Sequence, residues 1–229
     1  MRTRAGIVLQ ARLGSTRLPG KALMHIGGTT VLEHCLRRLV YAGVARVVLA
    51  TTDRAEDDAL AATAEALGAA VFRGDRDDVL GRMCGAAEAF DLDPIVRATG
   101  DNPAVDIQAP GRVLEALRAA RADYVVERGL PYGAAVEAIT RDALRAAARE
   151  ATAVEDREHV TTFVKRGAAR FRLVLPDAPA PLRRPDLRMT VDTADDLTYV
   201  RTLFERTGLE EPSLARLIRV AGRPRREVA

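Results

Sequence analysis

The chain begins with short apolar runs that alternate with longer segments in which apolar residues recur every three or four positions. The short runs have the length and composition of strands buried on both faces, and the longer segments have the spacing of helices. The predicted strands are Ala5–Ala11, Val44–Thr51, Ala69–Phe72, Pro94–Ala98 and Tyr124–Glu127. The predicted helices are Thr30–Tyr41, Glu56–Leu67 closed by Gly68, Asp78–Phe90 and Gln108–Ala120. This order predicts an α/β fold, with a mostly parallel sheet built from right-handed βαβ units and covered by helices on both faces.

The alternation breaks in the second half of the chain. We predict an extended segment, two helices and a strand at Pro131–Thr140, Arg141–Glu150, Arg157–Lys165 and Arg170–Leu175. Four prolines make Pro176–Pro185 a loop, which is followed by a strand, two helices and a charged tail at Arg188–Val191, Ala194–Thr207, Pro212–Val220 and Gly222–Ala229. Because no repeat or linker is present, residues 1–229 are predicted to form one domain, with residues 129–175 as an excursion from the βα pattern.

Composition and charge exclude several classes of protein. The chain has 229 residues, of which 48% are hydrophobic and 29% charged, enough for one substantial core. Its 35 Lys and Arg exceed its 32 Asp and Glu only slightly, so we expect no nucleic-acid partner. Cys35 and Cys84 lack CxxC spacing, which argues against a disulfide framework or a structural zinc site. No apolar run reaches the roughly 18 residues of a membrane span, so we predict a cytoplasmic protein without a membrane partner.

The first motif is QARLGSTRLPGK, residues 10–21, which directly follows the first predicted strand. Small residues in such a loop let backbone N–H groups approach phosphate oxygens, and cationic side chains neutralise a polyphosphate. Arg12, Arg17 and Lys21 supply those cations. The spacing matches neither GxxxxGK[ST] nor GxGxxG. Composition alone leaves open a second interpretation, a solvated basic loop.

Two further motifs place carboxylates at predicted strand ends. Asp101 lies in TGDNP after the fourth strand, and Asp192 lies in TVDTADDL after the strand Arg188–Val191. Carboxylate oxygens suit Mg²⁺, which proteins hold with one or two carboxylates plus substrate phosphates. Taken alone, Asp192 fits a helix N-cap better than a metal ligand. Strand ends of an open α/β sheet meet at one crevice, so the combination favours a site that contains the loop and both carboxylates.

In this order, the segments QARLGSTRLPGK, TGDNP and TVDTADDL resemble the cytidylyltransferase family. That family includes SpsF-like spore-coat polysaccharide proteins, CMP-Kdo synthetases and CMP-sialic acid synthetases. The resemblance extends from about Ile7 to Leu203. It implies a Rossmann-like fold of the nucleotide-diphospho-sugar transferase type with a dimerising excursion, and therefore a homodimer. It also implies transfer of CMP from CTP to the hydroxyl of a sugar or sugar acid, with release of pyrophosphate.

The resemblance assigns roles residue by residue. Catalytic roles fall to Arg12, Lys21 and Asp101, and Mg²⁺ binding falls to Asp101 and Asp192. The stretch FRGDRDDVLGR, residues 72–82, resembles the family segment that lines the nucleotide pocket, although an exposed turn with a helix cap at Asp77 or Asp78 explains it equally well. The full set of implied nucleotide contacts is Gln10, Ala11, Arg12, Gly14, Ser15, Arg17, Lys21, Arg73, Gly74, Arg82, Thr99 and Gly100.

The acceptor side is implied by PYGAAVE and DREHVT, which resemble the SpsF-like pattern. Glu137, Arg157 and His159 are the candidate acceptor contacts. His159 fits a helix-surface or interface histidine equally well. Family members often have proline where this chain has Thr162, which weakens any inference about the acceptor sugar.

Two other functions fit parts of the pattern. A glycosyltransferase that uses a nucleotide-sugar would also need a nucleotide crevice and a divalent ion. The three cations of the first loop match a triphosphate better than a diphosphate donor. A non-catalytic nucleotide-binding module would not need both Asp101 and Asp192 beside that loop.

Overall fold

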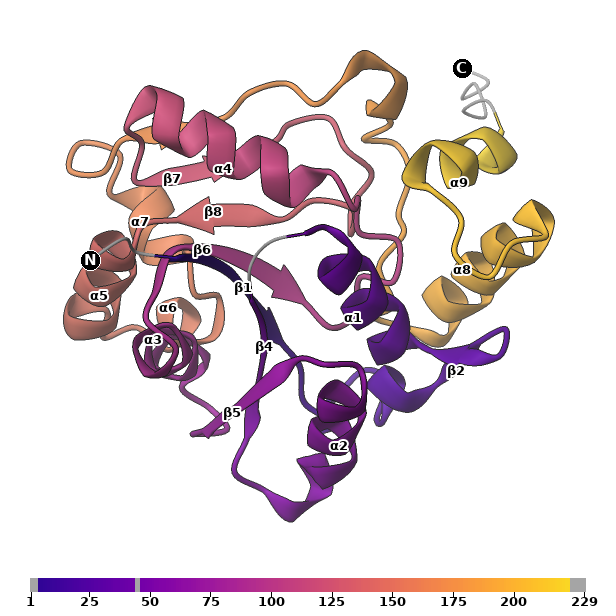
Figure 1. The fold of residues 1–229 in the computed structure, drawn as a ribbon, viewed down its shortest axis with the longest axis horizontal. Helices are drawn as coiled ribbons and strands as arrows, with labels where there is room; N and C mark the ends of the chain where they lie inside the picture. Colours follow the sequence, from indigo (N-terminus) through magenta and orange to yellow (C-terminus); the bar gives the residue numbers. More distant parts are fainter. Residues whose placement is uncertain (1–3, 44–45, 223–229) are drawn as a thin grey trace.

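A central sheet organises the molecule in the computed structural model, which describes residues 4–43 and 46–222 (Figure 1). In this part of the chain, seven strands pair in the order β5-β4-β1-β6-β8-β7-β9. Strands β5, β4, β1 and β6 are parallel, β8 is antiparallel to both of its neighbours, and β9 is parallel to β7. Their bounds are β1 Arg4–Gln10, β4 Val47–Thr52, β5 Ala70–Gly74, β6 Leu92–Thr99, β7 Tyr124–Val126, β8 Glu137–Ile139 and β9 Leu173–Val174. The prediction of a mostly parallel sheet is confirmed.

Helices connect and cover these strands. The α-helices are α1 Val31–Tyr41, α2 Asp58–Ala66, α3 Val79–Ala89, α4 Ala109–Ala120, α5 Arg141–Glu150, α6 Val154–Glu158, α7 Thr162–Arg166, α8 Ala194–Thr207 and α9 Leu214–Ala221. Short 3₁₀ turns occur at Lys21–Leu23, Ala55–Asp57 and Ala180–Leu182, and a small hairpin pairs β2 His25–Ile26 with β3 Thr29–Thr30. None of the helices in the described ranges is long and apolar enough to cross a membrane.

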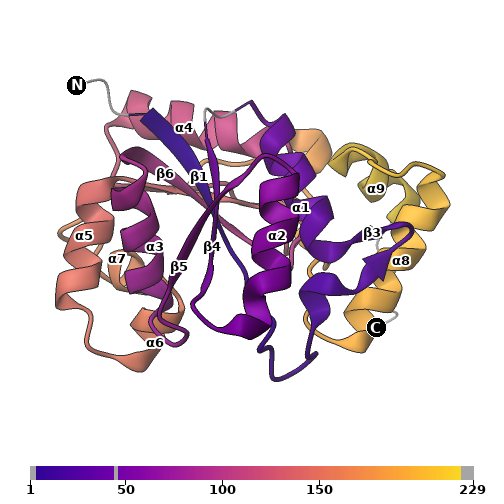
Figure 2. The same ribbon diagram turned by 60° about the horizontal axis from the view of Figure 1, so that its bottom comes forward.

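The sheet separates two apolar clusters, one on each face. Successive side chains of a strand point to opposite faces. In β1, Ile7 and Leu9 accordingly pack with α1, α2, α4, α8 and α9, whereas Val8 packs with α3 and α5. All three are fully buried. Figure 2 shows α3 and α5 on one side of β1, β4 and β5, and α1 and α2 on the other. The predicted covering of both faces is therefore confirmed.

The prediction for Pro131–Thr140 is incomplete, because this extended segment contains a sheet strand. Residues Glu137–Ile139 form β8, which lies between β6 and β7 and pairs with both. A charged residue at the start of a three-residue run hides the strand from a search for apolar stretches. Glu137 is nevertheless buried in the sheet, where cationic side chains surround it.

Three other predicted elements differ from the structure. The predicted helix Arg157–Lys165 is interrupted at Val160, which has φ of +34° and separates α6 from α7. The predicted strand Arg170–Leu175 is reduced to Leu173–Val174. Arg188–Val191 does not join the sheet: it forms an isolated bridge from Arg188 to Tyr132 and a backbone bond from Val191 N–H to the Asp101 carbonyl at 2.8 Å. Of the predicted strand Val44–Thr51, Val44 and Ala45 lie outside the described residues, as does the predicted tail beyond Gly222.

Candidate active site

A large cleft opens at the carboxyl ends of β1 and β6, where the strand-end rule places ligands in such sheets. Its volume is about 970 Å³. The walls come from the loop after β1, the turn after β6, the start of β8, the α6–α7 turn and the segment around Thr190. The predicted site residues that line it are Gln10, Ala11, Arg12, Gly14, Ser15, Arg17, Lys21, Arg82, Thr99, Gly100, Asp101, Glu137, His159 and Asp192.

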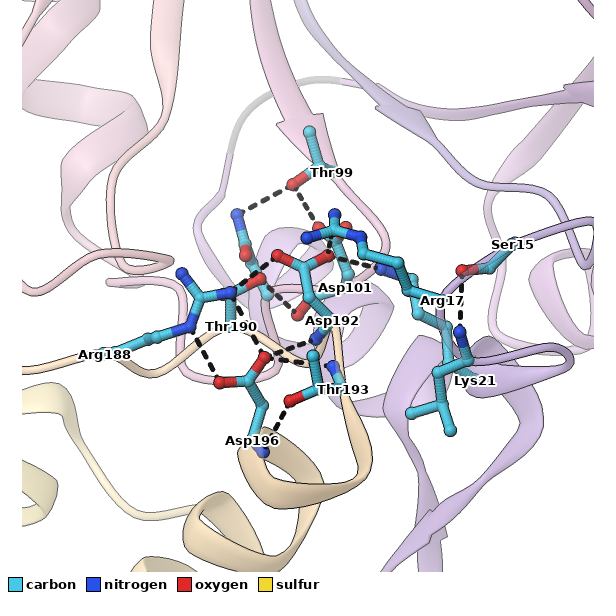
Figure 3. A network of polar contacts seen from close by, with 12 residues as sticks. Ser15, Arg17, Lys21, Thr99, Asp101, Arg188, Thr190, Asp192, Thr193 and Asp196 are labelled. Atoms are coloured by element: carbon cyan, nitrogen blue, oxygen red, sulfur yellow. Dashed lines mark hydrogen bonds and ion pairs between the residues drawn. The ribbon is translucent and has the colours of Figure 1, made fainter.

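Lys21 joins the three predicted motifs at one point. Its Nζ atom lies 2.9 Å from Oδ2 of Asp101 and 2.9 Å from Oδ1 of Asp192 (Figure 3). These two carboxylates are 91 positions apart in the sequence numbering but are held by one ammonium group. The loop and both carboxylates meet at one crevice, as expected, but only Asp101 follows a strand of the sheet, because the segment before Asp192 forms no sheet strand.

Polar contacts orient Asp101 within the turn after β6. The Thr99 hydroxyl donates to Oδ1 of Asp101 at 2.7 Å and accepts from the Asn102 amide at 2.7 Å. Gly100 lets this turn approach the loop after β1, because a Cβ atom there would lie 2.6 Å from the Cβ of Ala11. The backbone N–H of Gly100 donates to the Gln10 carbonyl at 2.8 Å. The two loops are thus joined through their backbones.

Asp192 is buried and surrounded by cations. Arg17 lies 3.0 Å from its Oδ1 atom, and Arg188 donates to its Oδ2 atom at 2.8 Å. Burial raises the pKa of Asp192, but the hydrogen bond and charge of Lys21, followed by Arg17 and Arg188, outweigh burial and hold that pKa below its ordinary value. The helix-cap interpretation of Asp192 is wrong, because the Thr193 hydroxyl caps α8 by accepting the N–H of Asp196 at 3.2 Å. The Asp192 carboxylate is therefore directed into the cleft.

Arg12 and Arg82 form the wall nearest α3. Arg12 donates to the Arg76 carbonyl at 2.7 Å and lies 3.6 Å from Glu158. Arg82 is only 3% exposed and donates to the carbonyls of Asp75 and Arg76. Asp78 caps α3 by accepting the N–H of Gly81, as the turn-and-cap interpretation of this stretch predicts. Arg82 thus both supports the turn and contributes to the cleft wall.

Three predicted contacts lie away from the cleft. Arg73 pairs with Asp58 at 2.7 Å beside the end of β5, and Gly74 accepts a backbone bond from Asp53. Arg157 donates to the Ala148 carbonyl at 2.9 Å. None of these three residues lines the cleft. Their assignment as ligand contacts has no support from the geometry of the described residues.

Glu137 lies at the start of β8, at the wall of the cleft, and is held by four donors. Its carboxylate accepts from the Arg97 guanidinium, the Tyr124 hydroxyl, the Thr161 hydroxyl and the Lys165 ammonium. Burial raises the pKa of Glu137, but Arg97 and Lys165 outweigh it and lower the pKa to about 2. His159 is exposed at the rim of the same region. Glu137 is therefore an ionised carboxylate that orders Arg97 and Lys165.

A glycine positions the segment that carries Asp192. Gly133 has φ of +93°, and a Cβ atom there would lie 2.6 Å from the backbone nitrogen of Thr190. Only glycine meets both conditions without displacing one of the two chains. Thr190 in turn donates through its hydroxyl to the Asp101 carbonyl at 3.2 Å. The loop before β8 and the chain from Thr190 to Asp192 therefore fit together at the cleft.

Sequence reasoning did not identify three residues that support the site. Asp57 accepts a backbone bond from the first loop, Arg188 holds Asp192 and Asp196, and Lys165 reaches Glu137. Each acts on a residue that belongs to another element. The sequence held a signal only for Arg188, which stands four residues before Asp192 and therefore close enough in the chain to pair with it.

The oxygen donors in the cleft suit a hard divalent ion whose remaining ligands come from the substrate. No group of three or more His, Cys, Asp and Glu side chains with metal-binding geometry occurs in residues 4–43 and 46–222. Asp101 and Asp192 provide two carboxylates beside a cationic loop. Two carboxylates plus phosphate oxygens and water are the usual ligands of Mg²⁺ in nucleotide sites. The arrangement thus suits a metal bound together with a nucleotide.

The comparison with known families decides the chemistry. A family model described as cytidylyltransferase matches residues 5–209. The chain belongs to the cytidylyltransferase family. It is a CTP-dependent nucleotidyltransferase, as its motifs predict, and the matched range includes the first loop, Asp101 and Asp192.

Individual relatives agree with the family assignment. This cytidylyltransferase is 35% identical over 215 residues to the spore coat polysaccharide biosynthesis protein SpsF of Bacillus subtilis, covering 91% of this chain and 89% of that protein. A cytidylyltransferase from Leptospira borgpetersenii superposes with a TM-score of 0.89 at 29% identity, covering 96% of this chain and 94% of the other. A CMP-2-keto-3-deoxy-manno-octonic acid synthetase in complex with CTP has the same fold, with a TM-score of 0.67, 22% identity and coverage of 89% and 99%.

Proposed function

We propose that this cytidylyltransferase transfers CMP from CTP to a hydroxyl of a sugar or sugar acid, with release of pyrophosphate, for polysaccharide or glycoconjugate biosynthesis. The single observation that carries the proposal is the meeting of Lys21 with Asp101 and Asp192 in one cleft. A phosphate-binding cation and two metal-type carboxylates are the groups that such a reaction needs at the α-phosphate.

In the proposed reaction, the acceptor hydroxyl oxygen attacks the α-phosphorus of CTP in line. A new oxygen–phosphorus bond forms, the bond from the α-phosphorus to the bridging oxygen of the β-phosphate breaks, and the hydroxyl proton passes to solvent. Arg12, Arg17 and Lys21 bind the triphosphate and stabilise the charge that develops on the departing pyrophosphate. Their places on one loop at the cleft wall support this role.

We further propose that Asp101 and Asp192 hold a divalent ion, Mg²⁺, together with the phosphate oxygens. Such an ion, when bound, would neutralise phosphate charge and favour ionisation of the attacking hydroxyl. Thr99 donates a hydrogen bond to Asp101 at 2.7 Å, and Arg188 donates one to Asp192 at 2.8 Å. These two bonds orient the carboxylates. No histidine lies in the three motifs, and we therefore assign the assistance in ionising the hydroxyl to the ion.

The remaining nucleotide contacts are also proposals. Gln10, Ala11, Gly14, Ser15, Thr99 and Gly100 border the cleft on the side of the loop, and Arg82 closes it toward α3. On the opposite side, Glu137 and His159 border the space for the acceptor.

We also propose a cytoplasmic homodimer in which residues 129–175 form the interface. Light scattering of the purified protein tests the dimer.

The decisive test of the function is pyrophosphate release with Mg²⁺ and each of the four ribonucleoside triphosphates, against a panel of acidic and neutral sugars. Release with CTP and one class of sugar supports the proposal and identifies that class. The alternative, a nucleotide-sugar-dependent glycosyltransferase, predicts no release with any pair and hydrolysis or transfer from a CDP- or UDP-sugar. An Asp101→Ala variant that remains folded and active at saturating Mg²⁺ would contradict the metal assignment.

A further inference from the structure

Lys21 lies between the two carboxylates that we propose as metal ligands. Its Nζ atom is 2.9 Å from both Asp101 Oδ2 and Asp192 Oδ1, and its side chain is only 13% exposed. In the described part of the chain, these two carboxylates are the only hydrogen-bond and ion-pair partners of that ammonium group. Lys21 is thus fully engaged with the carboxylates in the structure and does not extend toward open solvent.

The charges around the two carboxylates balance without any added ion. The ion pairs that surround Asp192 connect three cationic and three anionic side chains, which are Arg17, Lys21, Arg188, Asp101, Asp192 and Asp196. A divalent cation that entered this neutral cluster alone would leave an excess of two positive charges in a partly buried space. The cost of uncompensated charge rises as burial lowers the effective dielectric constant.

We propose that Lys21 is the protein's internal substitute for the divalent ion. In the ligand-free enzyme its ammonium group holds Asp101 and Asp192 in place, and it leaves them for the phosphate oxygens when CTP and the ion arrive together. This inference rests on the proposed function, because it takes the two carboxylates as the metal ligands. It adds an order to binding: without nucleotide, Lys21 opposes metal binding.

The triphosphate resolves both obstacles. Its negative charges compensate the incoming divalent ion, and its oxygens give Lys21 a new set of acceptors on the same loop side of the cleft. Metal and nucleotide therefore favour the binding of one another, and this coupling is reciprocal. The same exchange returns Lys21 to the carboxylates after pyrophosphate leaves, so Asp101 does not remain without its cationic partner.

Direct Mn²⁺ titration of the nucleotide-free protein, followed by electron paramagnetic resonance of the free ion, tests the exchange. A Lys21→Met variant is expected to bind Mn²⁺ about tenfold or more tightly than the wild type, within the usual range of couplings between sites. Lys165→Met is the matched control, because Lys165 lines the same cleft but pairs with Glu137. It should leave Mn²⁺ affinity unchanged. Adding Asp192→Asn to Lys21→Met should remove the gain, which localises the ion.

Lys21→Gln is a second variant in case Lys21→Met does not fold. Its amide carries no charge but can still donate a hydrogen bond to a carboxylate. Thermal unfolding should show stabilisation by Mn²⁺ in both Lys21 variants and little in the wild type. Equal Mn²⁺ affinity in the wild type and the folded Lys21 variants overturns the inference, as does a gain that survives Asp192→Asn. Pyrophosphate release by the wild type is assayed separately, so failure of the exchange is distinguishable from failure of the proposed function.

Discussion

The buried carboxylate of Asp57 accepts the backbone N–H of Leu13 at 2.8 Å. The same carboxylate accepts the backbone N–H of Thr52 at 3.2 Å and the hydroxyl of Thr52. Asp57 is fully buried at the start of α2, so these bonds are shielded from water. One side chain thereby ties the loop after β1 to the end of β4.

We predict that Asp57→Ala weakens both stability and nucleotide binding. Unpaired buried donors cost about 1–3 kcal/mol, so the free energy of unfolding should fall by about that amount. Because the released loop carries Arg12 and Arg17, the KM for CTP should rise by roughly tenfold, the equivalent of about 1.4 kcal/mol. Denaturant unfolding and CTP-dependent pyrophosphate release measure the two effects. Asp58→Ala, at an exposed neighbouring carboxylate, is the control, and an unchanged KM in Asp57→Ala contradicts the role of this anchor.

Neutralising either proposed metal ligand should abolish most activity without unfolding the protein. Asp101→Asn and Asp192→Asn keep the size of each side chain but remove its charge. We expect kcat/KM to fall by at least about 100-fold, the scale for losing one preorganised electrostatic group. Asp195→Asn, at an exposed position of the same motif, should retain activity. Circular dichroism and pyrophosphate release test this contrast, and comparable losses in all three variants would argue against a specific role for Asp101 and Asp192.

The sequence predicts the strands that are buried on both faces better than any other part of the fold. Ile7, Val8 and Leu9 are consecutive apolar residues because helices cover both faces of β1. The missed strand β8 begins with Glu137, whose burial depends on partners from β6 and α7 that no local pattern reveals. Val160 likewise interrupts a run with helical spacing, through a backbone conformation that is uncommon for a β-branched residue.

The site was predictable where chemistry follows a strand and unpredictable where it depends on tertiary contacts. Lys21 lies in the loop after β1 and Asp101 in the turn after β6, so their meeting follows from the topology of an open α/β sheet. Asp192 follows a segment that does not join the sheet, so its place beside Lys21 does not follow from that topology. Asp57 and Arg188 act through Leu13 and Asp192, respectively. The first contact joins residues 44 positions apart, and such a pairing emerges only from the folded chain.

Glu137 should make stability depend on pH in the acid range. Its pKa is lowered from 4.5 to about 2 in the folded protein. A lowered folded-state pKa contributes stability that is present above the unfolded value and is lost as the pH falls through the folded value. The free energy of unfolding should therefore decrease between about pH 4.5 and pH 2. Acid unfolding followed by circular dichroism measures this decrease.

A substitution at Glu137 tests whether this carboxylate, and not another one, causes the acid dependence of stability. Glu137→Gln leaves Arg97 and Lys165 without their shared anion, so we expect a loss of about 3–5 kcal/mol at neutral pH, as for a broken buried ion pair. The acid dependence of the remaining stability should become weaker. Glu150→Gln, which affects an exposed pair with Arg170, should change stability little. A Glu137→Gln protein with the wild-type unfolding curve would contradict this role.

Alanine substitutions at Gly133 and Gly111 should have opposite effects on the free energy of unfolding. A Cβ atom at Gly133 would lie 2.6 Å from the backbone nitrogen of Thr190, at a φ of +93° that alanine adopts only under strain. The strain of such a conformation is about 1–3 kcal/mol, and relieving it would displace the chain that carries Asp192. We expect Gly133→Ala to lower both the free energy of unfolding and the apparent affinity for metal in the turnover assay.

Gly111 is the matched position, because it lies in α4 and an alanine Cβ atom there would have no described neighbour within 4 Å outside its own helix backbone. Gly111→Ala should raise the free energy of unfolding by about 0.5–1 kcal/mol, since alanine loses less conformational freedom in a helix. Its activity and metal requirement should equal those of the wild type. If Gly133→Ala kept a normal metal requirement despite its lower stability, the contact between Gly133 and Thr190 would serve the fold alone and would not position Asp192.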